Sequence, residues 1–525
     1  MCMGTSRVIR KPVALHPYAE ARLLPSIAAQ SRNQVPLALK HRDIRITGRG
    51  SAVFPLVLEN SMLSRAEFDL DLINRYDGRG PRYTSYPTAV QFTEAFAEAD
   101  YREQVHRTKA QGGGGAMSIY VHIPFCHSLC YYCGCSKIVT RNRDRAERYL
   151  ETLLQEIALQ GELFGMEREV LQLHFGGGTP TYLDQGQMGR LMEGLRAHFK
   201  LSSSARREFS IEIDPRSVSL EDIPALARQG FNRVSMGVQD FAEDVQKAVN
   251  RIQSLEETRA LVETARGSGF GSVSLDLIYG LPLQTVEGFD RTLDQVLSMR
   301  PDRLAVYNYA HLPEMFRSQR MIQEDQLPSA SVKLEILRVA IEKLESAGYV
   351  YIGMDHFALA DDELVKAQER GELQRNFQGY STHADCDILG LGVTAIGRIG
   401  QAFTQNAKDI ETYESRLAQG RLPIARGLVM NADDRIRGVV IQEVMCQNRL
   451  DFGRLSQQLG IEFRTYFDAE WPHLERLLQD GLLDSFNEEG LVVSGRGRLL
   501  LRAIAMTFDR YLAEARTRKT FSKII

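Results

Sequence analysis

Between residues 116 and 348, short apolar runs alternate with longer segments in which apolar residues recur every three or four positions. The short runs predict strands, and the longer periodic segments predict amphipathic helices. The expected strands are 117–123, 170–175, 209–214, 232–238, 272–279 and 303–309. The expected helices are 144–164, 188–199, 223–229, 255–265, 289–299 and 332–347. Six successive strand–helix units predict an α/β fold in which helices cover a parallel sheet.

The segments on either side of these units have different patterns. Residues 62–115 are expected to form an N-terminal arm or lid. Residues 349–429 are short segments separated by glycines, and we expect an extension that closes the open side of the sheet. Residues 430–525 are mostly helical, with expected helices at 436–446 and 463–478 and a hairpin around Glu489–Gly490. This order is similar to a winged helix, but the mixed local charge favours a structural or lid domain over DNA binding.

Residues 1–61 differ in composition from the rest of the chain. They contain nine lysines and arginines but only three acidic residues, Glu20, Asp43 and Glu59. An arginine-rich segment that is poor in acids is typical of an organellar transit peptide. Alternatively, translation begins at Met62, and the upstream residues form a basic leader that is disordered or not translated. No clear amphipathic period runs through the segment, and we favour the second interpretation.

Composition and charge narrow the class of protein. The 525 residues are 43% hydrophobic and 25% charged, which is ordinary for a globular protein. A net charge of −3 gives no indication of a nucleic-acid partner. No apolar run approaches the roughly 18 residues that would span a bilayer. Seven cysteines without a secretory leader indicate a reducing compartment, so we expect a cytoplasmic protein. We also expect a monomer without a membrane span.

Four of the seven cysteines lie within ten residues, directly after the first expected strand. Cys126, Cys130, Cys133 and Cys135 form the pattern C-x3-C-x2-C-x-C on a loop that Pro124 separates from the strand. Clustered thiolates are soft ligands that suit iron–sulfur clusters or zinc. Zinc sites usually pair two C-x2-C knuckles or add distant histidines, and no second knuckle follows. An iron–sulfur site is the favoured interpretation, with zinc or a disulfide as alternatives.

Glycines and polar residues occur where the expected strands end, which is where parallel α/β barrels bind ligands. Gly177, Gly178 and Thr179 follow the second strand, and glycines there let the backbone approach a ligand, although a tight turn also explains them. Gln239 follows the fourth strand. His122 lies within the first strand and could equally be a hydrogen-bonded core residue. These positions are candidates for ligand binding.

Charged residues near or within the expected strands form a second group of candidates. Glu212 lies between Ile211 and Ile213 and therefore points to the opposite, interior face. An unpaired carboxylate there is costly, which indicates either a ligand site or a structural ion pair. Asp276 interrupts the apolar fifth strand. Arg251 follows the fourth strand and could pair with a ligand carboxylate or lie solvated on the surface.

The C-x3-C-x2-C spacing resembles the signature of the radical S-adenosylmethionine enzymes. The resemblance implies that Cys126, Cys130 and Cys133 bind three irons of a [4Fe–4S] cluster, with the fourth iron open to S-adenosylmethionine. It also implies that Tyr132 packs near the adenine of this cofactor. Six strand–helix units match the partial, TIM-like (β/α)6 barrel of that superfamily. The barrel is expected at 116–348, with an N-terminal arm and a mostly helical C-terminal domain.

Longer motifs resemble one family of that superfamily, the oxygen-independent coproporphyrinogen III oxidases, also called coproporphyrinogen dehydrogenases. The resemblance covers 62–525 and includes G-P-R-Y-T-S-Y-P-T (80–88), Y-V-H-I-P-F-C (120–126), F-G-G-G-T-P-T-Y (175–182), S-M-G-V-Q-D-F (235–241) and D-L-I-Y-G-L-P (276–282). It continues in Y-A-H-L-P (309–313), G-M-D-H-F-A (353–358) and N-F-Q-G-Y (376–380). The alternative is a related subfamily of haem chaperones, which bind and transfer haem. Cys135 and the R-Y-T-S-Y-P-T motif favour the oxidases.

The family resemblance implies a reaction of haem biosynthesis that needs no oxygen. Two propionate side chains of coproporphyrinogen III would each lose a hydrogen atom, CO2 and one electron and become vinyl groups, which gives protoporphyrinogen IX. A 5′-deoxyadenosyl radical, made from S-adenosylmethionine at the reduced cluster, would take a hydrogen atom from the β-carbon of each propionate. Two molecules of S-adenosylmethionine would be used per product, and whether two bind together stays open. A low-potential donor such as flavodoxin or ferredoxin would supply the electrons.

The resemblance also assigns residues by their motif positions. The three ligand cysteines and Glu212 are the expected catalytic residues, and Glu212 and Asp276 suit the cationic and hydroxyl groups of S-adenosylmethionine. Because the implied substrate carries four propionates, cationic and hydroxyl donors should line the rest of the cleft, and Arg82, Tyr83 and Ser85 of the arm are candidates, as part of a lid. The expected contacts of S-adenosylmethionine are Tyr120, Tyr132, Gly177, Gly178, Thr179, Glu212, Gln239, Arg251, Asp276, Ala310 and Ile396.

Overall fold

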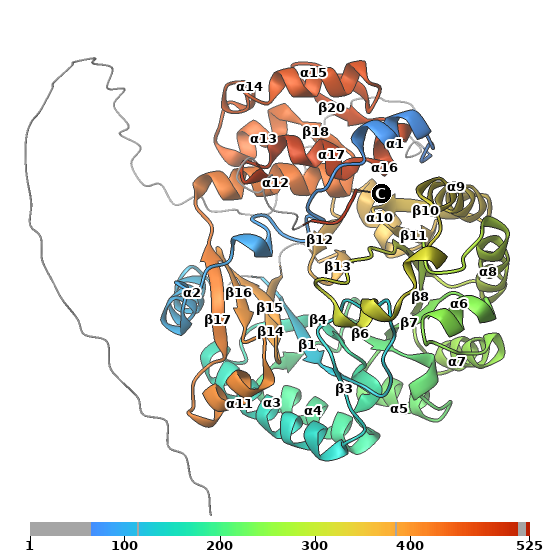
Figure 1. The fold of residues 1–525 in the computed structure, drawn as a ribbon. Helices are drawn as coiled ribbons and strands as arrows, with labels where there is room; N and C mark the ends of the chain where they lie inside the picture. Colours follow the sequence, from blue (N-terminus) through green and yellow to red (C-terminus); the bar gives the residue numbers. More distant parts are fainter. Residues whose placement is uncertain (1–64, 113–114, 384–385, 513–520, 525) are drawn as a thin grey trace, which may run out of the picture. The chain divides into compact units, whose positions relative to one another are not determined.

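The computed structural model describes residues 65–112, 115–383, 386–512 and 521–524. The expectations for residues 1–61 therefore lie outside the described residues. Six neighbouring strands of a large sheet run parallel to one another (Figure 1). They are β1 (Met117–Ile123), β4 (Glu169–Gly177), β6 (Glu208–Ile213), β7 (Arg233–Gln239), β8 (Ser272–Tyr279) and β9 (Arg303–Asn308). Each agrees with an expected strand to within about two residues, which confirms the predicted parallel arrangement.

One helix of each predicted unit covers the outside of these strands (Figure 1). The helices are α3 (Arg143–Phe164), α4 (Gln185–His198), α5 (Asp222–Gln229), α7 (Leu255–Gly267), α8 (Val286–Met299) and α9 (Ala330–Ser346). Capping explains where several begin, because Asn142, Asp184 and Ser254 each accept a hydrogen bond from a backbone N–H in the first turn. A short helix that the pattern did not predict, α6 (Glu243–Ala248), follows β7. No helix in the described part of the chain is long and apolar enough to cross a bilayer.

The two faces of the parallel strands differ in polarity. Ile211 and Ile213 of β6 are 0% and 4% exposed and belong to the main hydrophobic core, whereas Glu212 between them points the other way. The same alternation puts His174 of β4 and Asp276 of β8 on the inner face. We call the inner side of these six strands the lumen. Because buried charges are costly without partners, a charged lumen favours a polar ligand over a packed core.

The segment after α9 adds strands to both edges of the parallel sheet. Its elements are β10 (Tyr349–Gly353), β11 (His356–Leu359), α10 (Glu363–Glu369), β12 (Gln374–Asn376), β13 (Gly379–Ser381), β14 (Asp387–Leu391), β15 (Ile396–Ile399), β16 (Ala402–Asn406), α11 (Ile410–Ala418) and β17 (Ile424–Val429). At one edge β11 is antiparallel to β9, and β10 is antiparallel to β11. At the other edge β14 is parallel to β1 and leads to antiparallel β15, β16 and β17. The barrel-closing role of 349–429 stays a prediction.

The C-terminal segment combines helices with a small sheet. Its elements are α12 (Ala432–Gln447), β18 (Arg449–Asp451), α13 (Phe452–Leu459), α14 (Phe463–Tyr466), α15 (Trp471–Gln479), β19 (Leu483–Phe486), β20 (Gly490–Val493), α16 (Gly495–Leu499) and α17 (Leu501–Ala505). The predicted hairpin is present as β19 and β20, and β18 pairs with β20 as a third strand. The single helix predicted at 463–478 is wrong, because it is divided into α14 and α15 with Pro472 in the first turn of α15. Proline lacks a backbone N–H and is tolerated where a helix begins.

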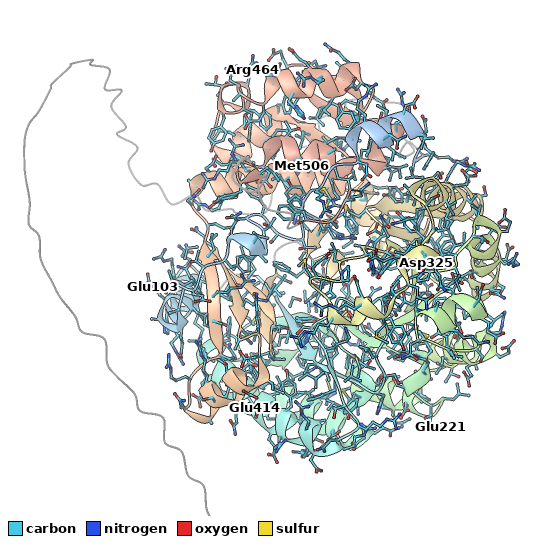
Figure 2. All side chains as sticks on the ribbon, in the orientation of Figure 1. Glu103, Glu221, Asp325, Glu414, Arg464 and Met506 are labelled. Atoms are coloured by element: carbon cyan, nitrogen blue, oxygen red, sulfur yellow. The ribbon has the colours of Figure 1, made fainter. Side chains whose placement is uncertain are left out.

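The first part of the N-terminal arm packs on the C-terminal segment, whereas its second helix contacts α3 and the strands β15–β17. The arm contains α1 (Leu70–Tyr76) and α2 (Glu98–Ala110). The Tyr83 hydroxyl donates a hydrogen bond to Asp509 at 2.9 Å, and both Leu72 and Tyr83 belong to the hydrophobic cluster of the C-terminal helices. A Cβ on Gly80 would lie 2.5 Å from the sulfur of Met506, which is labelled in Figure 2. A larger residue at this position would therefore require the Met506 side chain to shift.

Candidate active site

The cysteine loop joins the carboxyl end of β1 to α3, as the sequence predicts. Two short parallel strands pair at the base of the loop, β2 (Phe125–Cys126) and β3 (Ile138–Val139). The backbone N–H of Ile138 also donates to the Pro124 carbonyl oxygen at 2.6 Å. Both ends of the loop are therefore fixed to the end of β1, next to the lumen.

Each candidate iron ligand has a hydrogen-bond donor at its sulfur. The pairs are Cys126 with Thr179 Oγ1 (3.6 Å), Cys130 with Arg216 Nη2 (3.2 Å) and Arg251 Nη1 (3.5 Å), and Cys133 with the Cys135 N–H (3.4 Å). Burial raises the pKa of Cys126 to about 11, whereas a hydrogen bond from the Cys135 side chain lowers the pKa of Cys133 to about 6. Within the described residues, no three His, Cys, Asp or Glu side chains are grouped as a metal site. The ligand set stays a prediction, and the donors around the thiols suit an anionic iron–sulfur cluster.

The segment after β9 contacts the cysteine loop from the other side. The Gln319 amide donates to the carbonyl oxygens of Tyr132 (2.9 Å) and Ala310 (3.2 Å). The Ser318 hydroxyl donates to the carbonyl oxygen of Cys133 at 2.8 Å. These bonds bring Ala310 and Tyr132, two predicted cofactor contacts, to the same side of the loop.

A chain of contacts crosses the lumen from β1 to β6. The Tyr120 hydroxyl donates to His122 Nδ1 at 2.9 Å, and His122 Nε2 donates to the Ser136 carbonyl oxygen at 3.1 Å. Burial lowers the pKa of His122, so the ring is neutral and both of its nitrogens are satisfied. The Tyr120 ring stacks on His174 with centroids 5.8 Å apart, and His174 Nε2 lies 3.0 Å from Glu212 Oε1. The contacts hold the Glu212 carboxylate in a fixed orientation.

Glu212 and Asp276 are lumen carboxylates whose pKa values are shifted in opposite directions. Burial alone would raise the pKa of Glu212, but the hydrogen bond from His174 keeps it below the ordinary value. Burial and the nearby Glu212 charge raise the pKa of Asp276 to about 7, and Ser235 Oγ donates to its carboxylate at 3.2 Å. The Glu212 side chain is 45% exposed although it lies between core residues, so its free surface faces the lumen. Glu212 therefore offers a negative charge to a ligand.

Asp276→Asn is expected to raise the Tm of the ligand-free protein, and the gain should grow between about pH 5 and about pH 8. The native state binds the Asp276 proton more tightly than the unfolded state does, because its pKa is raised to about 7. In the wild-type protein, the carboxyl group of Asp276 therefore destabilises the native state more and more as the pH rises from the pKa of the unfolded state to about 7 and above. The amide of the variant does not titrate and has no such effect. Thermal unfolding at several pH values measures the gain. Asp484→Asn, at an exposed position, is the control, and a gain at Asp276 that does not vary with pH contradicts the raised pKa.

Arg251 and Gln239 lie against Gly237 and each keep an unpartnered polar atom. The Arg251 guanidinium binds both carboxylate oxygens of Asp214 at 3.1 and 3.2 Å and the Gly237 carbonyl oxygen at 2.5 Å. A β-bulge precedes Gln239, whose own φ is +71°. Bulges next to active sites often redirect a side chain. Among the described residues, neither Gln239 Oε1 nor Arg251 Nε has a hydrogen-bond partner. Buried polar atoms without partners indicate that a polar ligand completes the site.

The glycine turn after β4 packs closely on the start of the cysteine loop. The Thr179 N–H donates to the Phe125 carbonyl oxygen at 2.8 Å. A Cβ on Gly178 would lie 2.7 Å from the carbonyl oxygens of Phe125 and Pro124. Gly177 has a φ of +121°, in the region that favours glycine. The turn therefore requires glycines for packing, whether or not its backbone also contacts a ligand.

Gly178→Ala is expected to destabilise the protein by about 1–3 kcal/mol, because the added methyl group would meet two backbone oxygens that cannot move independently. Gly267→Ala is the matched control, since a Cβ there meets open space at the end of α7. The control should be neutral or stabilising by up to about 1 kcal/mol. Denaturant unfolding measures both free energies, and equal values for the two variants would contradict the packing argument.

Three predicted residues are not gathered at the lumen. Ile396 begins β15, two strands beyond β1, and packs against a separate hydrophobic cluster that includes Phe92 and Phe403. Tyr83 is buried against the C-terminal segment. Ser85 is buried within the arm, where its hydroxyl donates to the Pro87 carbonyl oxygen at 2.9 Å. The hydroxyl groups of Tyr83 and Ser85, which were expected to bind the substrate, therefore donate their hydrogen bonds within the protein.

The predicted set omitted three residues that the structure brings to the site. His174 supports Glu212, while Asp214 binds both Arg251 and Arg216, the latter at 2.7 Å. His174 alternates with apolar neighbours as Glu212 does, so the same argument could have found it. Asp214 directly follows β6, at the strand end where ligands bind. Arg216 carries no such signal in the sequence.

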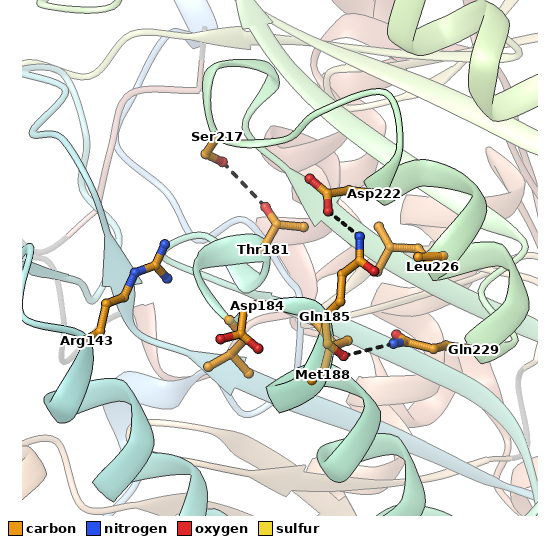
Figure 3. Close-up of a pocket in the computed structure, with 12 residues that line it drawn as sticks. Arg143, Thr181, Asp184, Gln185, Met188, Ser217, Asp222, Leu226 and Gln229 are labelled. Atoms are coloured by element: carbon orange, nitrogen blue, oxygen red, sulfur yellow. Dashed lines mark hydrogen bonds between the residues drawn. The ribbon is translucent and has the colours of Figure 1, made fainter.

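A separate cleft of about 450 Å3 lies among the helix ends outside the parallel strands (Figure 3). Figure 3 shows Gln185 pointing toward Asp222 and Thr181 toward Ser217, at 2.7 and 3.4 Å. None of the lining residues belongs to a parallel strand, and none is a predicted site residue. The candidate active site is therefore the lumen beside the cysteine loop.

Comparison with known proteins covers nearly the whole chain. Residues 120–296 match the Radical SAM superfamily model, and residues 430–500 match the HemN C-terminal domain model. An oxygen-independent coproporphyrinogen III oxidase of Pseudomonas aeruginosa is 52% identical over 88% of this chain and 100% of its own length. The chain belongs to this family. The family member of Escherichia coli K12 is 48% identical over 88% of this chain and 100% of its own length.

A solved structure supports the same assignment. The coproporphyrinogen III oxidase of Escherichia coli, described as a radical SAM enzyme, matches with a TM-score of 0.81 at 48% identity. The match covers 85% of this chain and all of that chain. Together with the sequence relatives, it confirms the predicted α/β radical S-adenosylmethionine fold and the oxidase interpretation. This chain is thus an oxygen-independent coproporphyrinogen III oxidase of haem biosynthesis.

Membership of the radical S-adenosylmethionine family implies a [4Fe–4S] cluster and S-adenosylmethionine. The residues present fit both groups. Three thiols on one loop have cationic or polar donors at their sulfurs. The lumen beside them holds the partly exposed Glu212 carboxylate and the unpartnered atoms of Gln239 and Arg251.

Proposed function

We propose that this chain converts coproporphyrinogen III to protoporphyrinogen IX by oxidative decarboxylation of two propionates to vinyl groups. One observation carries the proposal. The Glu212 carboxylate, kept ionised by His174, lies on the inner face of parallel strands beside the fixed three-cysteine loop. A barrel of this kind binds its reactants at the carboxyl ends of the strands.

Cys126, Cys130 and Cys133 would hold the [4Fe–4S] cluster. When bound, the cluster and S-adenosylmethionine supply the 5′-deoxyadenosyl radical that takes hydrogen from the substrate. The guanidinium groups near Cys130 would offset the negative charge of the thiolates. Cys135 would not bind iron, and its N–H would donate to the Cys133 sulfur.

Lumen residues would bind S-adenosylmethionine according to charge. Glu212 suits its cationic amino group, and Asp276 suits its ribose hydroxyl groups. Arg251 and Gln239, which have unpartnered atoms, suit its carboxylate and other polar groups. Ile396 lies apart and would take part only if a second molecule binds. The other proposed contacts are Tyr120, Tyr132, Gly177, Gly178, Thr179 and Ala310.

The remaining role of the chain is to orient the substrate and exclude water from a reactive radical. Tyr132 packs beside the buried Leu281, Tyr309 and Ile322, which would form an apolar wall next to the cofactor.

We further propose that the arm (62–115), the extension (349–429) and the C-terminal domain (430–525) enclose the barrel (116–348). A low-potential donor such as flavodoxin or ferredoxin would reduce the cluster of a cytoplasmic monomer. Two molecules of S-adenosylmethionine would be used per product.

Anaerobic reconstitution of the cluster tests the proposal. The loaded protein is incubated with coproporphyrinogen III, S-adenosylmethionine and a chemical reductant. Protoporphyrinogen IX and 5′-deoxyadenosine should appear together, at about two deoxyadenosines per product. Cleavage of S-adenosylmethionine without decarboxylation, accompanied by tight haem binding, would contradict it.

A further inference from the structure

A group of cationic and aromatic side chains extends the lumen beyond β9. His356 of β11 pairs in register with Ala305 of β9, and Ala305 pairs with Asp276 of β8. Side chains directly opposite one another lie on the same face of a sheet. His356 is therefore on the lumen face, two strands from Asp276. Its ring contacts Tyr307 of β9 and Tyr380 of β13, with centroids 5.9 and 5.4 Å apart.

Two arginines from different segments meet at this place. Arg82 of the arm forms an ion pair with Asp355, and its guanidinium lies over the Tyr307 ring at 5.9 Å. Arg375 of β12 lies over the Tyr380 ring at 4.8 Å, and its Nε is 3.4 Å from the carbonyl oxygen of Arg82. One carboxylate, that of Asp355, therefore faces two guanidinium groups. This group of side chains has an excess of positive charge.

Arg375 is the incompletely paired member of the group. It is only 4% exposed, and its Nη1 has no hydrogen-bond partner among the described residues. Within the same residues, no carboxylate lies at ion-pair distance from it. The nearby His356 Nδ1 also has no partner, and burial together with the Arg375 charge lowers the pKa of His356 to about 3. A buried cation without a counter-ion is costly, so an anion would complete this group of side chains.

We infer that Arg82, Arg375 and His356 form a binding site for one carboxylate of the tetrapyrrole, a propionate that the product retains. The planar guanidinium group binds carboxylates through two parallel hydrogen bonds. A propionate that reacts must leave as CO2. Its ion pair with arginine would stabilise the reactant but not the transition state, and would slow the reaction. Binding of a retained propionate does not slow the reaction in this way, because that carboxylate does not react. It fixes the orientation of the macrocycle. The inference rests on the proposed function.

Porphyrin binding to the cofactor-free protein tests the inference independently of turnover. Coproporphyrin III and protoporphyrin IX, which both keep the retained propionates, are titrated by fluorescence into wild type and Arg375→Gln. Both dissociation constants should rise by about tenfold or more and by similar factors, and Arg375→Lys should recover part of the loss. Arg207→Gln is the matched control, because Arg207 also lies over an aromatic ring, that of Phe209, directly before the amino end of β6. The control should leave both constants unchanged.

Turnover gives a second measurement. In the reconstituted enzyme, Arg375→Gln should raise KM for coproporphyrinogen III by about the same factor and change kcat less than about threefold. Arg82→Gln removes the other guanidinium and should act in the same direction, which keeps the test valid if Arg375→Gln does not fold.

Unchanged porphyrin affinity in either folded variant overturns the inference. A loss confined to coproporphyrin III also overturns it, because that result assigns the arginines to a reacting propionate. If wild type binds porphyrin but shows no turnover, the proposed function fails while the binding site stands.

Discussion

Cys130→Ala is expected to remove the iron–sulfur cluster and to lower turnover by at least about a thousandfold. The family resemblance gives the cluster three protein ligands, and two thiolates on one loop cannot retain it. Cys130 is the buried member of the set and has two guanidinium groups near its sulfur. Iron content and visible absorption after anaerobic reconstitution measure the loss. Iron should fall from about four atoms per chain to below about one.

Cys135→Ala is the matched control, because Cys135 lies on the same loop but is exposed and is not an expected ligand. It should keep about four irons per chain after the same treatment. Iron loss in Cys135→Ala as large as in Cys130→Ala would show that the ligand assignment is wrong. Stoichiometric zinc without iron in the wild-type protein would contradict the cluster altogether.

Glu212→Gln is expected to weaken S-adenosylmethionine binding by about a hundredfold and to lower deoxyadenosine formation at least as much. The amide keeps the shape of the side chain but removes the negative charge that His174 supports. Equilibrium binding to the reconstituted protein measures the first effect. Product analysis under reducing conditions measures the second, and iron content should stay at the wild-type level.

Glu208→Gln is the matched control on the same strand. Glu208 lies at the amino end of β6, where it accepts hydrogen bonds from Gln172 at 2.7 Å and Thr382 at 2.9 Å. Its loss should lower Tm but change S-adenosylmethionine affinity by less than about twofold. Equal loss of affinity in the two variants would mean that Glu212 acts through barrel stability, not through a contact with the ligand.

The repeating part of the fold could be predicted because its signals are local. Each of the six parallel strands is a short apolar run, and the helix of each unit has its own apolar stripe and often a capping residue. The pairing of β14 with β1 joins residues more than 250 positions apart, which no local pattern encodes. The division of α14 from α15 did have a local signal, Pro472, which the periodicity argument overlooked.

Local sequence patterns also predicted only part of the candidate site. Alternation along β6 was enough to point Glu212 into the lumen, and it could also have identified His174. The partners of Arg251 could not be predicted, because Asp214 and Cys130 come from two other segments of the chain. Arg375 is a second such case, since the side chains around it come from the arm, β9, β11 and the β12–β13 hairpin.

The most direct test of the central claim follows one hydrogen atom. Coproporphyrinogen III carrying deuterium at the β-carbons of its propionates is given to the reconstituted enzyme with unlabelled S-adenosylmethionine. If the lumen holds the reacting propionate against the radical, mass spectrometry of the 5′-deoxyadenosine should find one deuterium per molecule while protoporphyrinogen IX accumulates. Unlabelled deoxyadenosine formed alongside protoporphyrinogen IX would contradict the account.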